Sequence, residues 1–233
     1  VLGEKHPDTA ASYYNIGLVY NDKGDYDKAF AYYGKALAIR EEVLGEKHPD
    51  TAASYGNIGT VYYRKGDYDN ALAYYGKALA IDVDVLGEKH PDTATSYNNI
   101  GNVYYYKGDY DRALAYYEKA LAIDVEVLGE KHPATATSYY NIGNVYNNKG
   151  NYKNAILYWE ETFGSIKNSS RYIKSLSILR RYVLSNLSDK SFLRNTLSLA
   201  MDTVERARVD LSSMKDNFME PLIKSKKCGI MGE

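Results

Sequence analysis

The sequence predicts an all-α protein, an α-solenoid in which helix pairs stack one on the next. The first observation is a unit of 42 residues that occurs four times without insertion or deletion, at residues 1–42, 43–84, 85–126 and 127–168. The second is that apolar and aromatic side chains recur at helical spacing in two runs of each unit, with a glycine between the runs. A fixed period of this length is typical of repeat architectures, in which each repeat packs only against its neighbours.

The first helix of a repeat is expected to begin at the sequence His-Pro-Asp-Thr, which occupies residues 48–51 in the second copy. Pro49 suits the first turn, where its missing N–H would have no partner, and Asp50 suits the positive end of the helix dipole. Tyr55, Ile58 and Tyr62 then follow at the spacing of one helical face. This run predicts a helix of about four turns.

A tight turn and a second, longer helix complete the predicted repeat. Gly66 suits a left-handed helix cap, and Asp67 can cap the helix that follows. The second helix is expected to end at Gly87, after about five turns. Its apolar face consists of residues at helical spacing: Tyr68, Ala71, Leu72, Tyr75, Ala78, Leu79, Val83 and Leu86.

A glycine stands inside the first helix of all four copies, as Gly17, Gly59, Gly101 and Gly143. Glycine in a helix interior costs about 1 kcal/mol relative to alanine. Because all four copies keep this costly residue, we expect the two helices of a repeat to cross too closely there for a side chain.

The pattern N-[IL]-G-x-x-Y, followed by G-D-Y-D-x-A-[FL]-x-Y-Y-x-K-A-L, resembles the tetratricopeptide repeat. The 42-residue length and the linker L-G-E-K-H-P-x-T-A are similar to the kinesin light chain type of that repeat, over residues 1–168. The resemblance implies a right-handed superhelix whose first helices line a concave groove for peptide segments. It also implies a scaffold or adaptor without catalytic activity.

The differences between copies point to a binding stripe on the first helix. The second and third copies differ at seven positions, and four of these lie in one narrow sector of that helix: Ala53/Thr95, Gly56/Asn98, Thr60/Asn102 and Arg64/Tyr106. A solvated face that varies freely is the alternative. Asparagine is nevertheless kept along this stripe in every copy, at residues 15, 57, 99 and 141, despite its poor helix propensity. The resemblance implies that this amide hydrogen-bonds the ligand backbone, for which it has both a donor and an acceptor.

The candidate peptide-binding groove is polar, aromatic and nearly uncharged, with Arg64 as its main cation. Tyrosines and amides in this pattern favour a neutral extended segment as the ligand. The predicted groove residues are Tyr14, Asn15, Leu18, Asn21, Asn57, Thr60, Arg64, Asn98, Asn99, Asn102, Tyr106, Tyr140, Asn141, Asn144 and Asn148.

The amino-acid composition argues against two classes of protein, nucleic-acid-binding proteins and membrane-spanning proteins. Lys plus Arg (29) nearly balances Asp plus Glu (30), and the pI is about 6.5, which argues against nucleic acid as a partner. No apolar run approaches the ~18 residues of a membrane-spanning helix. The single cysteine, Cys228, fits a reducing compartment, so a cytoplasmic (intracellular) protein is expected.

Four histidines, at residues 6, 48, 90 and 132, occupy the same linker position of each repeat. Stacked repeats would hold them a helix pair apart, whereas zinc ligands converge at ~2 Å from the metal. We therefore expect a structural role for them and no metal site. Motifs for phosphate loops, dinucleotide binding or nucleophile elbows are missing from the sequence, so no catalytic residue and no cofactor is predicted.

Residues 169–233 leave the repeat pattern and are expected to form a C-terminal helical pair, a degenerate fifth repeat that caps the array, with a flexible tail. Docking of a partner by its long helix is the alternative. Because the chain begins in mid-repeat, a segment of a longer protein is expected, with an uncapped N-terminal repeat.

The leading hypothesis is a non-enzymatic scaffold that binds a protein or peptide ligand in the groove. Two alternatives stay open: a regulatory module of a signalling enzyme whose catalytic domain lies outside this chain, and an array that associates end to end through its uncapped N-terminal repeat.

Overall fold

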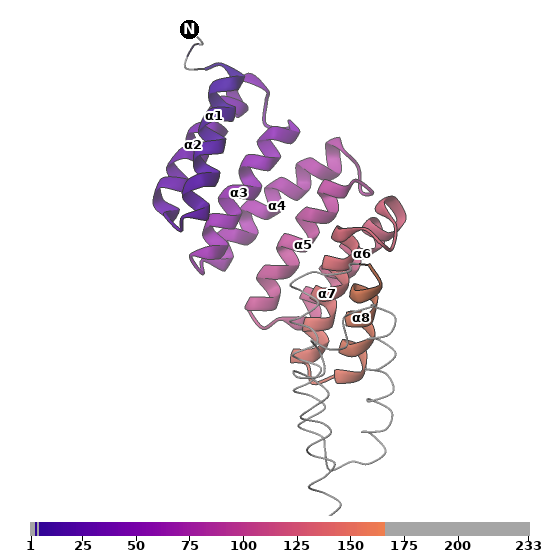
Figure 1. Ribbon diagram of the computed structural model, residues 1–233. Coiled ribbons are helices and arrows are strands. Elements are labelled where there is room, and N and C mark those ends of the chain that lie inside the picture. The colour runs from indigo at the N-terminus through magenta and orange to yellow at the C-terminus, as the bar shows by residue number, and fades with distance from the viewer. Residues whose placement is uncertain (1–2, 4, 166–233) are drawn as a thin grey trace, which may run out of the picture. The chain divides into compact units, whose positions relative to one another are not determined.

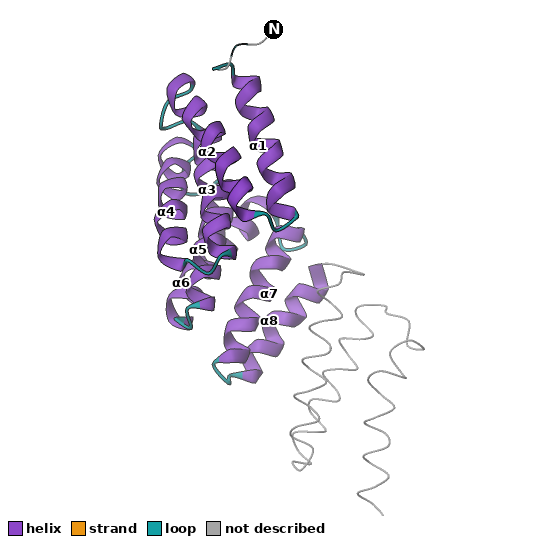
Figure 2. Ribbon diagram, turned by 90° about the vertical axis from the view of Figure 1, so that its left-hand side faces the viewer, coloured by secondary structure: helices purple, strands orange, loops and turns teal. Residues whose placement is uncertain are grey.

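The structure, a computed structural model, describes residue 3 and residues 5–165, so the predicted cap and tail at residues 169–233 lie outside the described part. Within this part the chain folds into helices joined by short loops, as Figure 2 shows. The helices are α1 (Pro7–Asp22), α2 (Tyr26–Val43), α3 (Pro49–Arg64), α4 (Tyr68–Val85), α5 (Pro91–Tyr106), α6 (Tyr110–Leu128), α7 (Pro133–Asn148) and α8 (Tyr152–Ser165). The all-α prediction and the register of the repeats are confirmed.

The chain divides into two compact units, of which the first is Val1–Gly129 and the second begins at Glu130. The first unit contains three helix pairs, α1–α2, α3–α4 and α5–α6, which follow one another in Figure 1. The second unit contains the pair α7–α8 within the described residues.

Each first helix begins at the predicted sequence, and its histidine caps it. The Nδ1 atom of His48 accepts a hydrogen bond from the backbone N–H of Asp50 at 3.1 Å, and His90 does the same for Asp92 at 3.2 Å. Proline follows at the first helical position in α1, α3, α5 and α7. The histidines therefore satisfy backbone donors at helix starts, a structural role whose form the sequence had not specified.

The turn between the two helices of a repeat has the predicted residues in the predicted roles. Gly66 has φ of +79°, a left-handed conformation that glycine adopts without strain. Asp67 caps α4, since its Oδ1 atom accepts a hydrogen bond from the backbone N–H of Asn70 at 3.3 Å. The turn therefore fixes where the first helix ends and the second begins.

The close helix crossing predicted from the repeated glycine is confirmed. A Cβ atom on Gly59 would lie 2.8 Å from Cδ1 of Tyr75, and one on Gly101 would lie 2.7 Å from Cε1 of Tyr117. The buried ring of the second helix therefore lies directly on the backbone of the first. Trp159 takes the place of this tyrosine at Gly143 in the second unit.

Consecutive repeats of the first unit share apolar clusters. Ile58 and Val61 of α3 are buried against Ala29 and Tyr33 of α2, and the next repeat copies this arrangement with Ile100 and Val103 of α5. Burial of these side chains holds each repeat on the one before it. Stacked tyrosine pairs add to the packing within each repeat, with ring centroids 5.5, 5.4 and 5.6 Å apart at Tyr20–Tyr32, Tyr62–Tyr74 and Tyr104–Tyr116.

Candidate functional site

The predicted groove residues lie on the first helices of the repeats. In the first unit they are Tyr14, Asn15, Leu18 and Asn21 on α1, Asn57, Thr60 and Arg64 on α3, and Asn98, Asn99, Asn102 and Tyr106 on α5. The remaining four, Tyr140, Asn141, Asn144 and Asn148, lie on α7 in the second unit. Most are half-buried, while Asn15, Arg64, Tyr106 and Asn148 are exposed.

Several of these side chains connect neighbouring first helices. The Nδ2 atom of Asn57 donates a hydrogen bond to the Tyr14 hydroxyl at 2.5 Å, and Nη1 of Arg64 donates to the backbone carbonyl of Asn21 at 3.2 Å. The ring of Tyr106 packs edge-on against Tyr63, with centroids 5.6 Å apart. The stripe is therefore one continuous surface across α1, α3 and α5, and its side chains hold one another in place.

Two stripe residues, Thr60 and Asn102, also form hydrogen bonds with the tyrosine at the close crossing of the two helices of their repeat. Thr60 Oγ1 lies 3.0 Å from the Tyr75 hydroxyl, and the Tyr117 hydroxyl donates a hydrogen bond to Asn102 Oδ1 at 2.7 Å. Leu18 stands at the corresponding position of the first repeat. The buried hydroxyl of Tyr33 has no hydrogen-bond partner among the described residues, because leucine offers none.

A cavity of about 250 Å³ lies between α3 and α5. Asn57 of α3 and Asn99 of α5, both predicted groove residues, line it, and Tyr14 reaches it from α1. The space exists because α3 carries Gly56 where α1 carries Tyr14, so no side chain fills the wall there. Small-molecule sites usually measure roughly 300–1,000 Å³, so this cavity matches a single side chain better than a cofactor.

A carboxylate lies in the wall of this cavity. Asp82 of α4 is only 7% exposed, and its Oδ2 atom accepts a hydrogen bond from Ser96 Oγ of α5 at 2.6 Å. Burial raises the pKa of Asp82 above its usual range, and the nearby Asp92 carboxylate raises it further. Within the described part of the chain, Asp82 forms no ion pair.

The sequence placed Gly56 on the varying stripe but not among the predicted groove residues, and Asp82 was not identified at all. Asp82 lies on a second helix, whereas only first helices were expected to line the groove. One signal was present: Arg40, Asp82 and Asp124 occupy the same position in three copies, which is a reversal of charge at a buried place. A buried position at which the charge changes sign between otherwise matching repeats indicates a local change in the polar contacts between the repeats.

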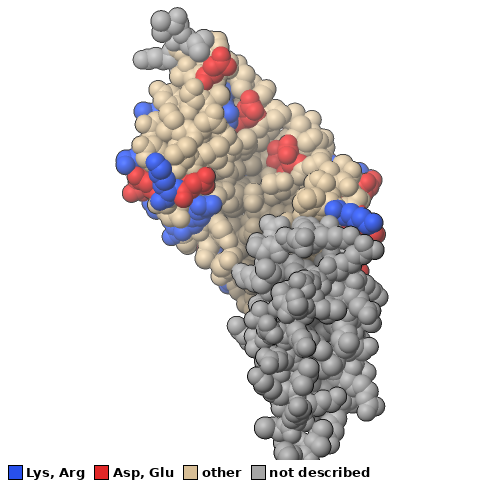
Figure 3. Space-filling model, in the orientation of Figure 1, with Lys and Arg blue, Asp and Glu red and all other residues tan. Residues whose placement is uncertain are grey.

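Other charged side chains are largely paired at the helix ends. Lys65 and Lys107 each contact an aspartate of the preceding repeat, Asp27 and Asp69, at 2.8 and 2.6 Å. Such exposed pairs contribute little stability. Over α1–α6, the face drawn in Figure 3 is mostly uncharged in its middle, with charged side chains gathered toward the helix ends.

The described residues contain no group of three or more His, Cys, Asp or Glu side chains placed to hold a metal ion. None of the helices described here is long and apolar enough to cross a membrane.

A helix pair repeated every 42 residues, with glycine under an aromatic ring at the crossing, defines an α-solenoid repeat protein. Residues 8–82, 55–124 and 92–163 match the tetratricopeptide repeat family. These overlapping matches extend over more than half of the chain, so the chain belongs to the tetratricopeptide repeat family. Repeats of this family are generally protein–protein interaction modules. No curated protein matches the chain.

Solved structures confirm the resemblance to kinesin light chain repeats. BtubC (BKLC) from P. vanneervenii is 28% identical, with a TM-score of 0.61 over 67% of this chain and 63% of that protein. The chain thus spans less than two thirds of that protein. A putative kinesin light chain with nearly identical TPR-like repeats, from Podosopora anserina, is 20% identical, with a TM-score of 0.67 over 88% of this chain and 99% of that one. At this identity, the second likeness concerns the fold alone.

Proposed function

We propose that the stripe on α1, α3 and α5 binds an extended segment of a partner protein, so that the chain acts as a non-catalytic scaffold or adaptor. The observation that carries the proposal is the cavity between α3 and α5, which opens among predicted groove residues and has the size of one side chain. Asn57 and Asn99 border it. Their amides can donate to and accept from the backbone of a segment laid across the helices.

The α7 helix carries the same residue types at the matching positions, with Tyr140 and Asn141 both half-buried. We propose that they bind a partner segment by the same kinds of contact. Exposed Tyr106 supplies an aromatic contact of the kind that dominates binding energies at interfaces. The cytoplasm is the proposed setting, since the single Cys228 fits a reducing compartment.

A peptide-display selection tests this function without knowledge of the partner. The chain is screened beside an Asn99→Ala, Asn141→Ala variant, and Glu118→Ala serves as the control because Glu118 is exposed on the second helix α6. Asn102 is left unchanged, because its loss would also free the buried Tyr117 hydroxyl. A consensus peptide that the chain and the control enrich and the double variant loses supports the proposal. Equal enrichment by all three proteins, with folding intact by circular dichroism, refutes it.

One observation favours end-to-end association as a second function. Ile16 and Val19 of α1 are 38% and 52% exposed, whereas their counterparts Ile58 and Val61 are buried against the preceding repeat. A second copy of the chain could cover this apolar face. Mass measured by light scattering should then rise with concentration and should stay monomeric in an Ile16→Lys, Val19→Lys variant. A wild-type chain that stays monomeric at all concentrations excludes this function.

A further inference from the structure

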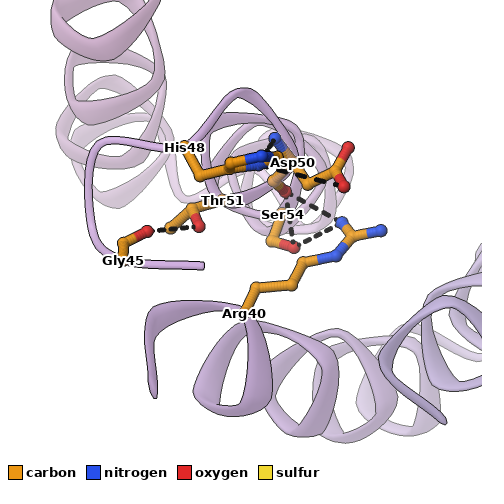
Figure 4. Close-up of polar contacts among 6 residues, drawn as sticks. All are labelled: Arg40, Gly45, His48, Asp50, Thr51 and Ser54. Atoms are coloured by element: carbon orange, nitrogen blue, oxygen red, sulfur yellow. Dashed lines mark hydrogen bonds and ion pairs between the residues drawn. The ribbon is translucent and has the colours of Figure 1, made fainter. Parts of the chain in front are cut away.

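The first junction, where α2 of the first repeat packs on α3 of the second, contains a buried arginine of the chain itself. Arg40 of α2 is only 8% exposed, and its Nη1 atom donates hydrogen bonds to the Asp50 carbonyl at 2.9 Å and to Ser54 Oγ at 2.8 Å (Figure 4). Its guanidinium carbon lies 4.6 Å from the centroid of the Tyr14 ring. The buried guanidinium of Arg40 therefore fills the space between the first and second repeats, where it binds two hydrogen-bond acceptors of α3 and packs on the Tyr14 ring.

The second junction, where α4 packs on α5, has the same acceptor residues as the first but no arginine. Asp92 and Ser96 of α5 stand where Asp50 and Ser54 stand in α3, but the position of Arg40 is taken by Asp82. The position of the aromatic ring is taken by Gly56, which opens the cavity of about 250 Å³. The place that a guanidinium fills in one junction is therefore open in the next.

The polarity of the second junction is also reversed. The charged residues that line the cavity are Asp82 and Asp92, and its lining includes no lysine, arginine or histidine. A carboxylate in such a buried place is costly unless a cation or hydrogen-bond donors compensate it. Ser96 supplies one hydrogen bond to Asp82, and His90 lies near enough to lower its pKa, but among the described residues no lysine or arginine forms an ion pair with this carboxylate.

We propose that the cavity between α3 and α5 is a guanidinium pocket that takes one arginine side chain of the bound segment, an inference that rests on the proposed function. The guanidinium would bind the Asp82 carboxylate and the acceptors of α5, as Arg40 binds those of α3. Charge-assisted hydrogen bonds from a planar, forked donor group are among the strongest that a carboxylate forms. Arginine is preferred over lysine because a planar group fits between two helices and keeps its charge when desolvated.

The test uses single-residue probes, so that it does not depend on a known partner. Nα-acetyl-arginine methylamide is titrated into the ¹⁵N-labelled chain and followed by NMR, beside the neutral isostere Nα-acetyl-citrulline methylamide. The arginine probe should shift the amide signals of Gly56, Ser96 and Asn99, with affinity at least about tenfold above that of citrulline. Equal shifts from both probes, or none from either, would overturn the pocket. A lysine probe that binds as tightly as the arginine probe would overturn its preference for guanidinium.

Two variants and one matched control locate the binding. Asp82→Asn preserves shape and removes the charge, and Gly56→Tyr fills the cavity at a position where an added Cβ meets no other atom within 4 Å. Both should lose the arginine response. Asp84→Asn, the same substitution at an exposed residue of α4, should keep it. Retained binding in Gly56→Tyr contradicts the assignment even where Asp82→Asn fails to fold.

The two proposals can fail separately. If the probes distinguish arginine from citrulline but the display selection enriches no peptide, the cavity does bind a guanidinium, but the peptide groove falls, and with it the assignment of that arginine to a bound segment. If a consensus peptide emerges without arginine and the probes do not bind, the groove stands and the guanidinium pocket falls.

Discussion

The two junctions of the first unit, between α2 and α3 and between α4 and α5, are built from equivalent helices but differ in the charge and size of the side chains between them. At the first, Arg40 and Tyr14 fill the space between the repeats with a cation and a ring. At the second, Asp82 and Gly56 leave a cavity with a carboxylate in its wall. The apolar contacts that stack the repeats are the same at both junctions. In this solenoid, therefore, the apolar residues that stack the repeats are different from the polar residues that decide whether the space between two repeats is filled or open.

The largest effect is expected at the helix crossing inside each repeat, which all repeats share. Gly101→Ala places a Cβ atom 2.7 Å from the buried ring of Tyr117, so it should destabilise the chain by about 1–3 kcal/mol through overpacking. Gly76→Ala is the control, because Gly76 is exposed on α4 and an added Cβ meets nothing within 4 Å. This control should gain up to about 1 kcal/mol from helix propensity. Urea unfolding measures both, and equal stabilities would contradict the close crossing.

Removing the arginine of the closed junction should have the next largest effect. Arg40→Met keeps much of the apolar stem but removes the hydrogen bonds to Ser54 Oγ and to the Asp50 carbonyl and the contact with Tyr14, while the hydrogen bond from Ser54 Oγ to the Asp50 carbonyl remains. A loss of about 2 kcal/mol is expected. Thermal unfolding checks this value. A variant as stable as the wild type would mean that Arg40 does not close the junction.

A matched pair of tyrosines compares the helix crossings within the first and the second repeat. Tyr75→Phe removes the hydroxyl that lies 3.0 Å from Thr60 Oγ1 and should cost about 1 kcal/mol. Tyr33→Phe removes a buried hydroxyl that has no partner among the described residues, so it should be neutral or stabilising. Burial raises the pKa of Tyr33 to about 12, which agrees with a hydroxyl shielded from water. Urea unfolding that shows equal losses for both variants would contradict this difference.

The smallest effect concerns pH. Because the folded state raises the pKa of Asp82, it favours the protonated carboxyl, so this contribution to stability is greatest below 3.8 and is lost as pH rises through the raised pKa. The Asp92 carboxylate also raises the pKa of Asp82, whereas the hydrogen bond from Ser96 and the nearby His90 lower it. Asp82→Asn should remove this dependence and be the more stable protein at neutral pH, by chemical unfolding at several pH values. Wild-type and variant curves that stay parallel would contradict the prediction.

The fold could be predicted from the sequence because residues kept in every copy of the repeat mark the positions that the backbone geometry requires. Gly59 and Gly101 pointed to the close crossing, and Gly66 and Asp67 to the turn, since each role depends on local backbone geometry. His48 was expected to be structural, but its action as a helix cap required the position of its ring.

The candidate site could be predicted only in part. Asn57 and Asn99 were found because they recur along one helix face. Asp82 was missed because it reaches the cavity from another helix, a proximity that no spacing along the chain displays. The tie between Asn102 and Tyr117 was missed for the same reason. Whether the stripe binds a peptide stays a prediction.

The most direct measurement copies the closed junction into the open one. In the Gly56→Tyr, Asp82→Arg variant, the second junction carries the two residues that fill the first. Affinity for Nα-acetyl-arginine methylamide is measured by NMR beside the wild type, together with the melting temperature. Binding should fall by at least about tenfold while the melting temperature stays the same or rises. A folded variant that binds the probe as the wild type does would contradict this prediction.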